Sequence, residues 1–189
     1  MTKFKKILQD SKDNKKFIGI RNYDYDDDKL LCGFIKDFND NLVLVQHFTE
    51  YGEMDGLILV RMEDIEILES NDDYCLAIQF LAEYKNNINE IYKNIDLSNS
   101  ENWQFDFLNK FKNTDKIIAI EFEGDYTIYG IIEDLDVKFI TLKTVGQIGD
   151  LDGFSTYRLR NIKALMIDNF ESLNRKILLD WNLKNTIKE

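Results

Sequence analysis

The sequence predicts an α+β protein, mainly β, built as two tandem five-stranded small barrels that each carry an N-terminal and a C-terminal helix. The first observation is an internal repeat, because residues 33–69 align with residues 130–166 at a constant offset of 97 without a gap. The second is that each copy contains short β-rich runs, flanked by segments of helical periodicity. We therefore expect two domains, residues 1–98 and 99–189. The aligned pairs include Gly33/Gly130, Asp37/Asp134, Gly52/Gly149, Asp55/Asp152, Gly56/Gly153 and Arg61/Arg158.

The elements of each copy are expected in the order helix, five strands, helix. Residues 2–15 place Phe4, Ile7 and Leu8 at helical spacing in a charged background, which predicts an amphipathic helix. Turn chemistry is found at residues 39–41 and at Asp55-Gly56, where asparagine, aspartate and glycine favour chain reversal. The expected strands of the first copy are residues 17–20, 30–38, 42–48, 57–61 and 65–68.

A terminal helix is expected over residues 71–95 because the apolar period there changes to 3.6. The offset of 97 continues through this segment and pairs Phe80 with Ile177 and Tyr84 with Trp181. Gly33 lies inside the second strand and indicates a bend or bulge. Closing five short strands around such a bend removes unpaired edges. The apolar face of the helix is expected to hold Ala77, Phe80, Leu81, Tyr84, Ile88, Ile91, Tyr92 and Ile95.

Short segments in both copies are similar to motifs of a known family. Residues 33–44 resemble the first motif of the Sm-like small barrels with a shortened turn, and residues 60–65 and 157–162 resemble the second motif. The resemblance implies an SH3-like roll in each half. In that family the corresponding turn asparagine and arginine bind an RNA base, so the resemblance implies nucleic-acid binding by Asn41, Arg61 and Arg158 as an alternative function.

The charge balance favours a protein partner over nucleic acid. The chain has 24 basic and 35 acidic residues, a net charge of −11, and such a field repels a phosphate backbone. Residues 1–100 hold 12 basic and 20 acidic residues, so most of the excess lies in the first half. A basic protein partner suits this charge, although solubility alone also explains it.

No apolar run approaches the roughly 18 residues of a membrane span, and residues 1–16 lack the apolar core of a signal peptide. We expect a cytoplasmic monomer or small homo-oligomer.

The sequence contains none of the motifs that mark common catalytic sites, namely a nucleophile elbow, a phosphate loop, a HExxH pair or a dinucleotide fingerprint. We therefore expect no enzymatic activity and no cofactor. His47 is expected to be structural because no cysteine or carboxylate cluster accompanies it in its strand. Cys32 and Cys75 are replaced by Tyr129 and Ser172 in the second copy, so neither a disulfide nor a zinc site is expected.

Acidic and aromatic residues gather in the loops of the first half, which suits a protein interface. We interpret the chain as a non-enzymatic acidic interaction module, such as an inhibitor or immunity-type protein that binds a basic partner. The acidic loop at residues 24–28 could also hold a calcium ion. It lacks the glycine and the distal glutamate of an EF-hand, so a solvated turn is favoured. The candidate partner-binding residues are Tyr23, Asp24, Tyr25, Asp26, Asp27, Asp28 and Tyr51.

The charged positions that keep their identity in both halves include Asp37/Asp134 and Arg61/Arg158. One hypothesis is a binding site that occurs twice. The other is an ion pair or turn contact that each half needs for folding. We favour the structural hypothesis, because binding sites diverge between duplicates while the constraints of the fold persist.

Overall fold

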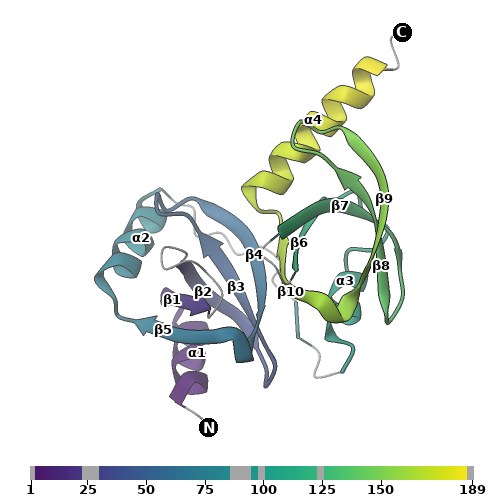
Figure 1. Cartoon of the computed structure of the whole chain (residues 1–189). Helices are drawn as coiled ribbons and strands as arrows, with labels where there is room; N and C mark the ends of the chain where they lie inside the picture. Colours follow the sequence, from purple (N-terminus) through teal and green to yellow (C-terminus); the bar gives the residue numbers. More distant parts are fainter. Residues whose placement is uncertain (1–2, 23–29, 86–94, 98–100, 123–125, 187–189) are drawn as a thin grey trace. The chain divides into compact units, whose positions relative to one another are not determined.

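The computed structural model of the protein describes residues 3–22, 30–85, 95–97, 101–122 and 126–186. The chain divides into two compact units, Met1–Asn99 and Ser100–Glu189, and both units show the same order of strands (Figure 1). Strands dominate both units and helices flank them, so the expected mainly β, mixed α+β class is confirmed.

The first unit is an antiparallel sheet with the strand order β5-β1-β2-β3-β4. A short 3-10 helix, η1, joins β4 to β5, and β1 pairs with both β2 and β5. Figure 1 shows its strands curving strongly, with α1 below β1 and β2 in this view and α2 at the upper left. The elements are α1 (Lys3–Asn14), β1 (Ile18–Asn22), β2 (Leu31–Phe38), β3 (Leu42–Phe48), β4 (Met54–Arg61), η1 (Met62–Asp64), β5 (Ile65–Ser70) and α2 (Asp73–Tyr84).

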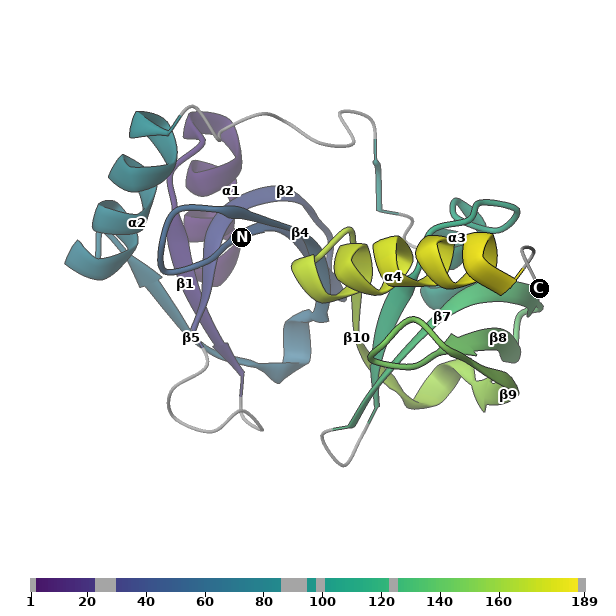
Figure 2. The same cartoon turned by 90° about the horizontal axis from the view of Figure 1, so that it is seen from above.

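The second unit repeats this arrangement with the strand order β10-β6-β7-β8-β9. Its last helix, α4, is longer than α2 and runs outward from the end of β10 as one straight helix (Figure 1, Figure 2). The elements are α3 (Trp103–Asn109), β6 (Ile118–Phe122), β7 (Tyr126–Leu135), β8 (Phe139–Val145), β9 (Leu151–Arg158), η2 (Leu159–Asn161), β10 (Ile162–Ile167) and α4 (Phe170–Thr186).

The pair Asp55-Gly56 does not form the expected turn. It lies inside β4, where the two residues stand opposite the single residue His47 of β3. Gly56 has a φ of 76°, the left-handed conformation that glycine adopts at a β-bulge without steric cost. The turn lies earlier, where Thr49 and Glu53 bond through their backbones. The sequence prediction was wrong because an Asp-Gly pair serves a glycine bulge as well as a hairpin turn.

Gly33 is required by close approach of a neighbouring strand. A Cβ at this position would lie 2.0 Å from the carbonyl oxygen of Gln46 on β3. The bulge expected at Gly33 instead falls at Lys36, where the register between β2 and β3 shifts. Gly130 in the second unit has the same role, since its Cβ would lie 2.7 Å from the carbonyl oxygen of Lys143.

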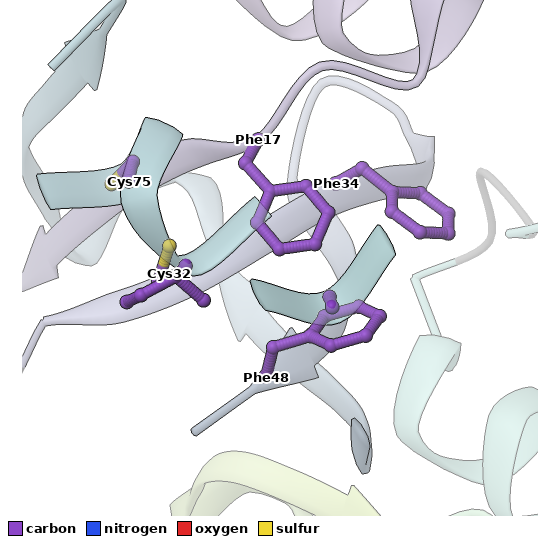
Figure 3. Packing of buried hydrophobic residues seen from close by; sticks show 7 residues of the cluster. Phe17, Cys32, Phe34, Phe48 and Cys75 are labelled. Atoms are coloured by element: carbon purple, nitrogen blue, oxygen red, sulfur yellow. The ribbon is translucent and has the colours of Figure 1, made fainter. Parts of the chain in front are cut away.

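The core of the first unit is built around three phenylalanines from three strand regions (Figure 3). The ring centroids of Phe17, Phe34 and Phe48 are separated by 4.7 to 6.1 Å, which is the range of favourable tilted aromatic pairs. Cys32 and Cys75 are buried beside them as free thiols. The hydrogen bond between the two thiols is the largest cause that raises the pKa of Cys32 above its ordinary value.

Helix α2 contacts this core through a face other than the predicted one. Its buried residues are Cys75, Ile78 and Ala82, whereas Phe80 and Tyr84 of the predicted face are exposed. The predicted continuation of the helix through residues 86–94 lies outside the described residues. The periodicity located an apolar face on the helix correctly, but the helix has two such faces and packs with the smaller side chains.

A glycine fixes how each terminal helix is turned. Gly52 has a φ of 71°, and a Cβ there would lie 2.6 Å from the backbone nitrogen of Ala82 in α2. Gly149 has a φ of 75°, and its Cβ would lie 2.4 Å from the backbone nitrogen of Leu179 in α4. In both units the loop after the third strand therefore packs directly against the helix backbone, at positions related by the offset of 97.

The substitution Gly149→Ala should destabilise the second unit by about 2–4 kcal/mol, since it combines the cost of a positive φ with overpacking against α4. Gly153→Ala is the matched control, because Gly153 also has a positive φ (88°) but no atom within 4 Å of its Cβ position. It should cost only about 1–2 kcal/mol. Both tryptophans, Trp103 and Trp181, lie in the second unit, so tryptophan fluorescence during urea unfolding reports on this unit alone. Equal losses for the two variants would contradict the proposed role of Gly149.

Candidate protein-binding surface

An apolar row lies on the outward side of α2. Leu76, Phe80 and Tyr84 follow one another at intervals of four residues, and their exposed fractions are 45%, 64% and 79%. The rings of Phe80 and Tyr84 are stacked with their centroids 6.3 Å apart. Because four residues make slightly more than one helical turn, the three side chains form a continuous stripe. Contiguous exposed apolar side chains of this size mark interaction sites more often than isolated ones do.

The start of α2 is fixed by a side-chain cap. The carboxylate of Asp72 accepts hydrogen bonds from the backbone nitrogens of Tyr74 and Cys75, at 3.0 and 3.1 Å. This cap satisfies two of the free N–H groups that every helix start presents. Together with the Gly52 contact near the other end, it holds the helix with Cys75, Ile78 and Ala82 inward. The row of Leu76, Phe80 and Tyr84 must then face outward.

Tyr51 borders α2 from the loop between β3 and β4. The ammonium of Lys85 donates to the Tyr51 carbonyl oxygen (2.8 Å) and to Oε1 of Glu53 (2.7 Å), which ties the loop to the end of the helix. The Tyr51 side chain is 65% exposed. A hydrogen bond with Glu50 raises the pKa of Tyr51, and the nearby Tyr74 adds to this shift. The predicted partner-binding residue Tyr51 thus lies in a cluster with Glu50 and Tyr74.

Acidic side chains accompany the apolar row. Asp73 lies at the start of α2, and Glu83, near its end, accepts a hydrogen bond from the neutral amide of Gln79 (2.9 Å). Lys85, directly after the last residue of α2, is paired with Glu53. We call this surface the α2 face. It comprises Glu50, Tyr51, Asp73, Tyr74, Leu76, Phe80, Glu83 and Tyr84.

None of the other predicted site residues belongs to the α2 face. Tyr23, Asp24, Tyr25, Asp26, Asp27 and Asp28 lie outside the described residues. Asn41 and Arg61 are neighbours, since the backbone nitrogen of Met62 bonds to the carbonyl oxygen of Asn41 (2.8 Å). The Arg61 guanidinium lies 2.7 Å from Asp64 and 3.6 Å from Glu63. Arg158 in the second unit instead lies over the ring of Phe139, at 5.1 Å from its centroid.

Asp37 and Asp134 make equivalent contacts in the two units. Lys12 at the end of α1 lies 2.7 Å from Asp37, and Lys112, just after α3, lies 3.1 Å from Asp134. Each pair links the N-terminal helical segment of its unit to the second strand. Asp37 also accepts a hydrogen bond from the backbone nitrogen of Leu97 (2.8 Å). These contacts are of the kind that the structural hypothesis expects.

His47 lies across the β4 bulge from Asp55, with 3.3 Å between Nδ1 and Oδ2. In the described ranges no group of three or more histidine, cysteine or acidic side chains is placed to hold a metal ion. None of the helices in the described part of the chain is long and apolar enough to cross a membrane.

Comparison of the chain with protein-family models and with curated proteins finds no match.

Which side of α2 faces outward was not predicted from the sequence, although the repeat contains a signal for the apolar row. At the offset of 97, Leu76, Phe80 and Tyr84 correspond to Leu173, Ile177 and Trp181, so the positions stay large and apolar in both copies. The buried positions Cys75 and Ala82 correspond to Ser172 and Leu179 and vary in size and polarity. The repeat therefore indicates an apolar row that both copies keep. It does not indicate that this row faces outward.

The substitution Lys112→Met should raise the pKa of Asp134, because the hydrogen bond from Lys112 is the main cause that lowers this pKa. A lowered folded pKa means that the pair stabilises the fold above the ordinary carboxyl pKa of about 3.9 and that this contribution is lost as the pH falls through the folded value. Carbon-13 NMR titration of the aspartate carboxyls measures the shift. The control Lys138→Met removes a lysine of the same unit that does not contact Asp134, and it should leave this pKa unchanged. An unaltered Asp134 pKa in Lys112→Met would show that the ion pair does not form.

Proposed function

We propose that the protein is a non-enzymatic interaction module, of the inhibitor or immunity type, that binds a basic protein partner through the α2 face. The observation that carries the proposal is the exposed row Leu76-Phe80-Tyr84 bordered by acidic residues. An apolar centre with a charged border is the usual anatomy of a protein interface. The net charge of −11 would add long-range attraction to a basic partner and speed association.

The energetics of the α2 face suit specific binding. Burying a large apolar side chain contributes roughly 1.5–3 kcal/mol, and the row offers three of them. Tyrosines are common among residues that dominate binding energy, and Tyr51, Tyr74 and Tyr84 supply rings with polar tips. Asp73 and Glu83 would then select a partner with lysines or arginines around an apolar centre, because a like-charged partner is repelled.

We further propose that each unit is an SH3-like roll of the Sm type. The strand order β5-β1-β2-β3-β4, the 3-10 link between β4 and β5, and the glycine at which β2 and β3 approach closely support this assignment. A shared fold does not transfer a function. The alternative of RNA binding by Asn41, Arg61 and Arg158 gains no specific support, since Asp64 and Glu63 lie beside Arg61 and would oppose a phosphate.

Affinity capture from the source cells tests the proposal. The immobilised chain should retain a basic protein in stoichiometric amount at moderate salt, with bound protein and bound nucleic acid both quantified. Phe80→Asp should weaken binding of the purified partner about 100-fold, as expected for a central interface residue worth about 2.7 kcal/mol. Glu83→Lys should weaken it mainly at low salt, because it acts through the charge of the border.

The matched control is Ile177→Asp, which makes the same change at the equivalent position of α4 and should leave capture intact. Retention of the partner by Phe80→Asp would contradict the proposal that the α2 face is the binding surface. Capture of RNA in place of protein, lost in Arg61→Ala, would instead support the alternative function.

A further inference from the structure

The last strand of the second unit has an open edge. Strand β9 ends the order β10-β6-β7-β8-β9 and, in the part of the chain that the structure describes, pairs only with β8 (Figure 1). Six of its eight residues are exposed, and the side chain of Phe154 is 62% exposed. An open strand edge presents backbone N–H and C=O groups that can pair with a further strand.

The outward backbone groups of this edge can be assigned to particular residues. In an antiparallel pair, residues that exchange hydrogen bonds with the partner strand alternate with residues whose N–H and C=O groups point away from it. The backbone nitrogen of Leu159 bonds to the carbonyl oxygen of Lys138 (2.9 Å), and the next pair in the register is Arg158 with Phe139. The residues of β9 that direct backbone groups to the open edge are therefore Phe154, Thr156 and Arg158.

Side-chain contacts agree with this assignment. The hydroxyl oxygens of Thr141 and Thr156 are 2.9 Å apart. Opposite side chains come closest in pairs that exchange no backbone hydrogen bonds, which is the kind of pair assigned to Thr156. The N–H groups of Ser155 and Tyr157 then point to β8.

Cations lie beside the same part of β9. Lys143 stands opposite Phe154 in the register, so its side chain shares a face of the sheet with that of Arg158. Lys138 and Arg160 lie at the end of the strand. None of these four cations forms an ion pair with a residue in the described ranges. The single acidic residue of β9, Asp152, lies at its other end.

The first unit does not carry this charge. At the offset of 97, the four equivalent positions hold Asn41, Gln46, Arg61 and Glu63. Arg61 has Asp64 at 2.7 Å and Glu63 at 3.6 Å, whereas the second unit has Asn161 and Arg160 at these positions. Arg158 therefore lacks the acidic partners that neutralise Arg61.

We propose that an extended acidic segment of a partner protein pairs with β9 as an added strand. Its backbone would bond to the outward groups of Phe154, Thr156 and Arg158, and its carboxylates would lie against the four cations. In strand addition, main-chain hydrogen bonds supply affinity and alternate side chains supply specificity, so acidic residues are expected at every second position of the partner. This surface belongs to the second unit and does not depend on the proposed function.

An NMR titration of the full chain with a synthetic peptide tests the proposal. The probe is a blocked seven-residue peptide that alternates glutamate and valine, and its control has lysine in place of glutamate. The glutamate peptide should shift the amide signals of Phe154, Thr156 and Arg158 more than those of Ser155 and Tyr157, because only the first three amides face the edge.

Two results of this titration would overturn the proposal. The first is the absence of shifts in β9 at millimolar glutamate peptide, or equal shifts with the lysine peptide. The second is a set of shifts in β9 caused by oligouridylate but not by the glutamate peptide, which would favour nucleic-acid binding.

Two pairs of variants separate the backbone contribution from that of charge. Thr156→Pro removes an outward N–H and should abolish binding, while Thr156→Val keeps the N–H and should retain it. Arg160→Glu introduces the residue of the first unit and should weaken binding about fivefold at low salt. Lys184→Glu makes the same charge change in α4 and should have no effect.

Circular dichroism checks that each variant is folded. The charge pair tests the proposal even if Thr156→Pro does not fold. Binding that survives in folded Thr156→Pro would overturn strand addition, and equal affinities of Arg160→Glu and Lys184→Glu would overturn the role of the cations.

Discussion

In both units a glycine at positive φ brings the loop after the third strand against the backbone of the terminal helix. The Cβ positions of Gly52 and Gly149 fall 2.6 and 2.4 Å from the backbone nitrogens of Ala82 and Leu179, so no larger residue fits. This contact determines which side of the helix meets the core. The outward rows on α2 and α4 follow from it, since each lies opposite the anchored side.

The duplication kept the geometry of these rows and changed their charges. Large apolar residues occupy the three outward positions in both helices, and the flanks carry Gln79 and Glu83 in one helix but Lys176 and Asp180 in the other. Specificity is a difference between affinities, and unlike charges around similar apolar centres are an efficient way to create it.

The order of elements along the chain and most of their positions followed from the sequence because they rest on local patterns. A continuous apolar run after turn residues located β3 at residues 42–48. The turn at Asn39 forms as its side chain predicts, accepting from the backbone nitrogens of Asn41 and Leu42. The sequence predictions were wrong where contacts between residues far apart in the chain determine the local structure. Asp55-Gly56 forms a bulge because His47 of another strand stands opposite, and Phe80 faces outward because Gly52 holds Ala82 inward. Neither constraint is visible in the local sequence.

The orientation of the terminal helices is the central claim, and Trp181 reports on it directly. In the variant Trp103→Phe, the emission of Trp181 is measured as the protein is diluted, together with its quenching by iodide. The account predicts emission typical of a water-exposed indole and strong quenching by iodide at low protein concentration. Emission at short wavelength that resists iodide at every dilution would contradict it, because Trp181 would then face the interior.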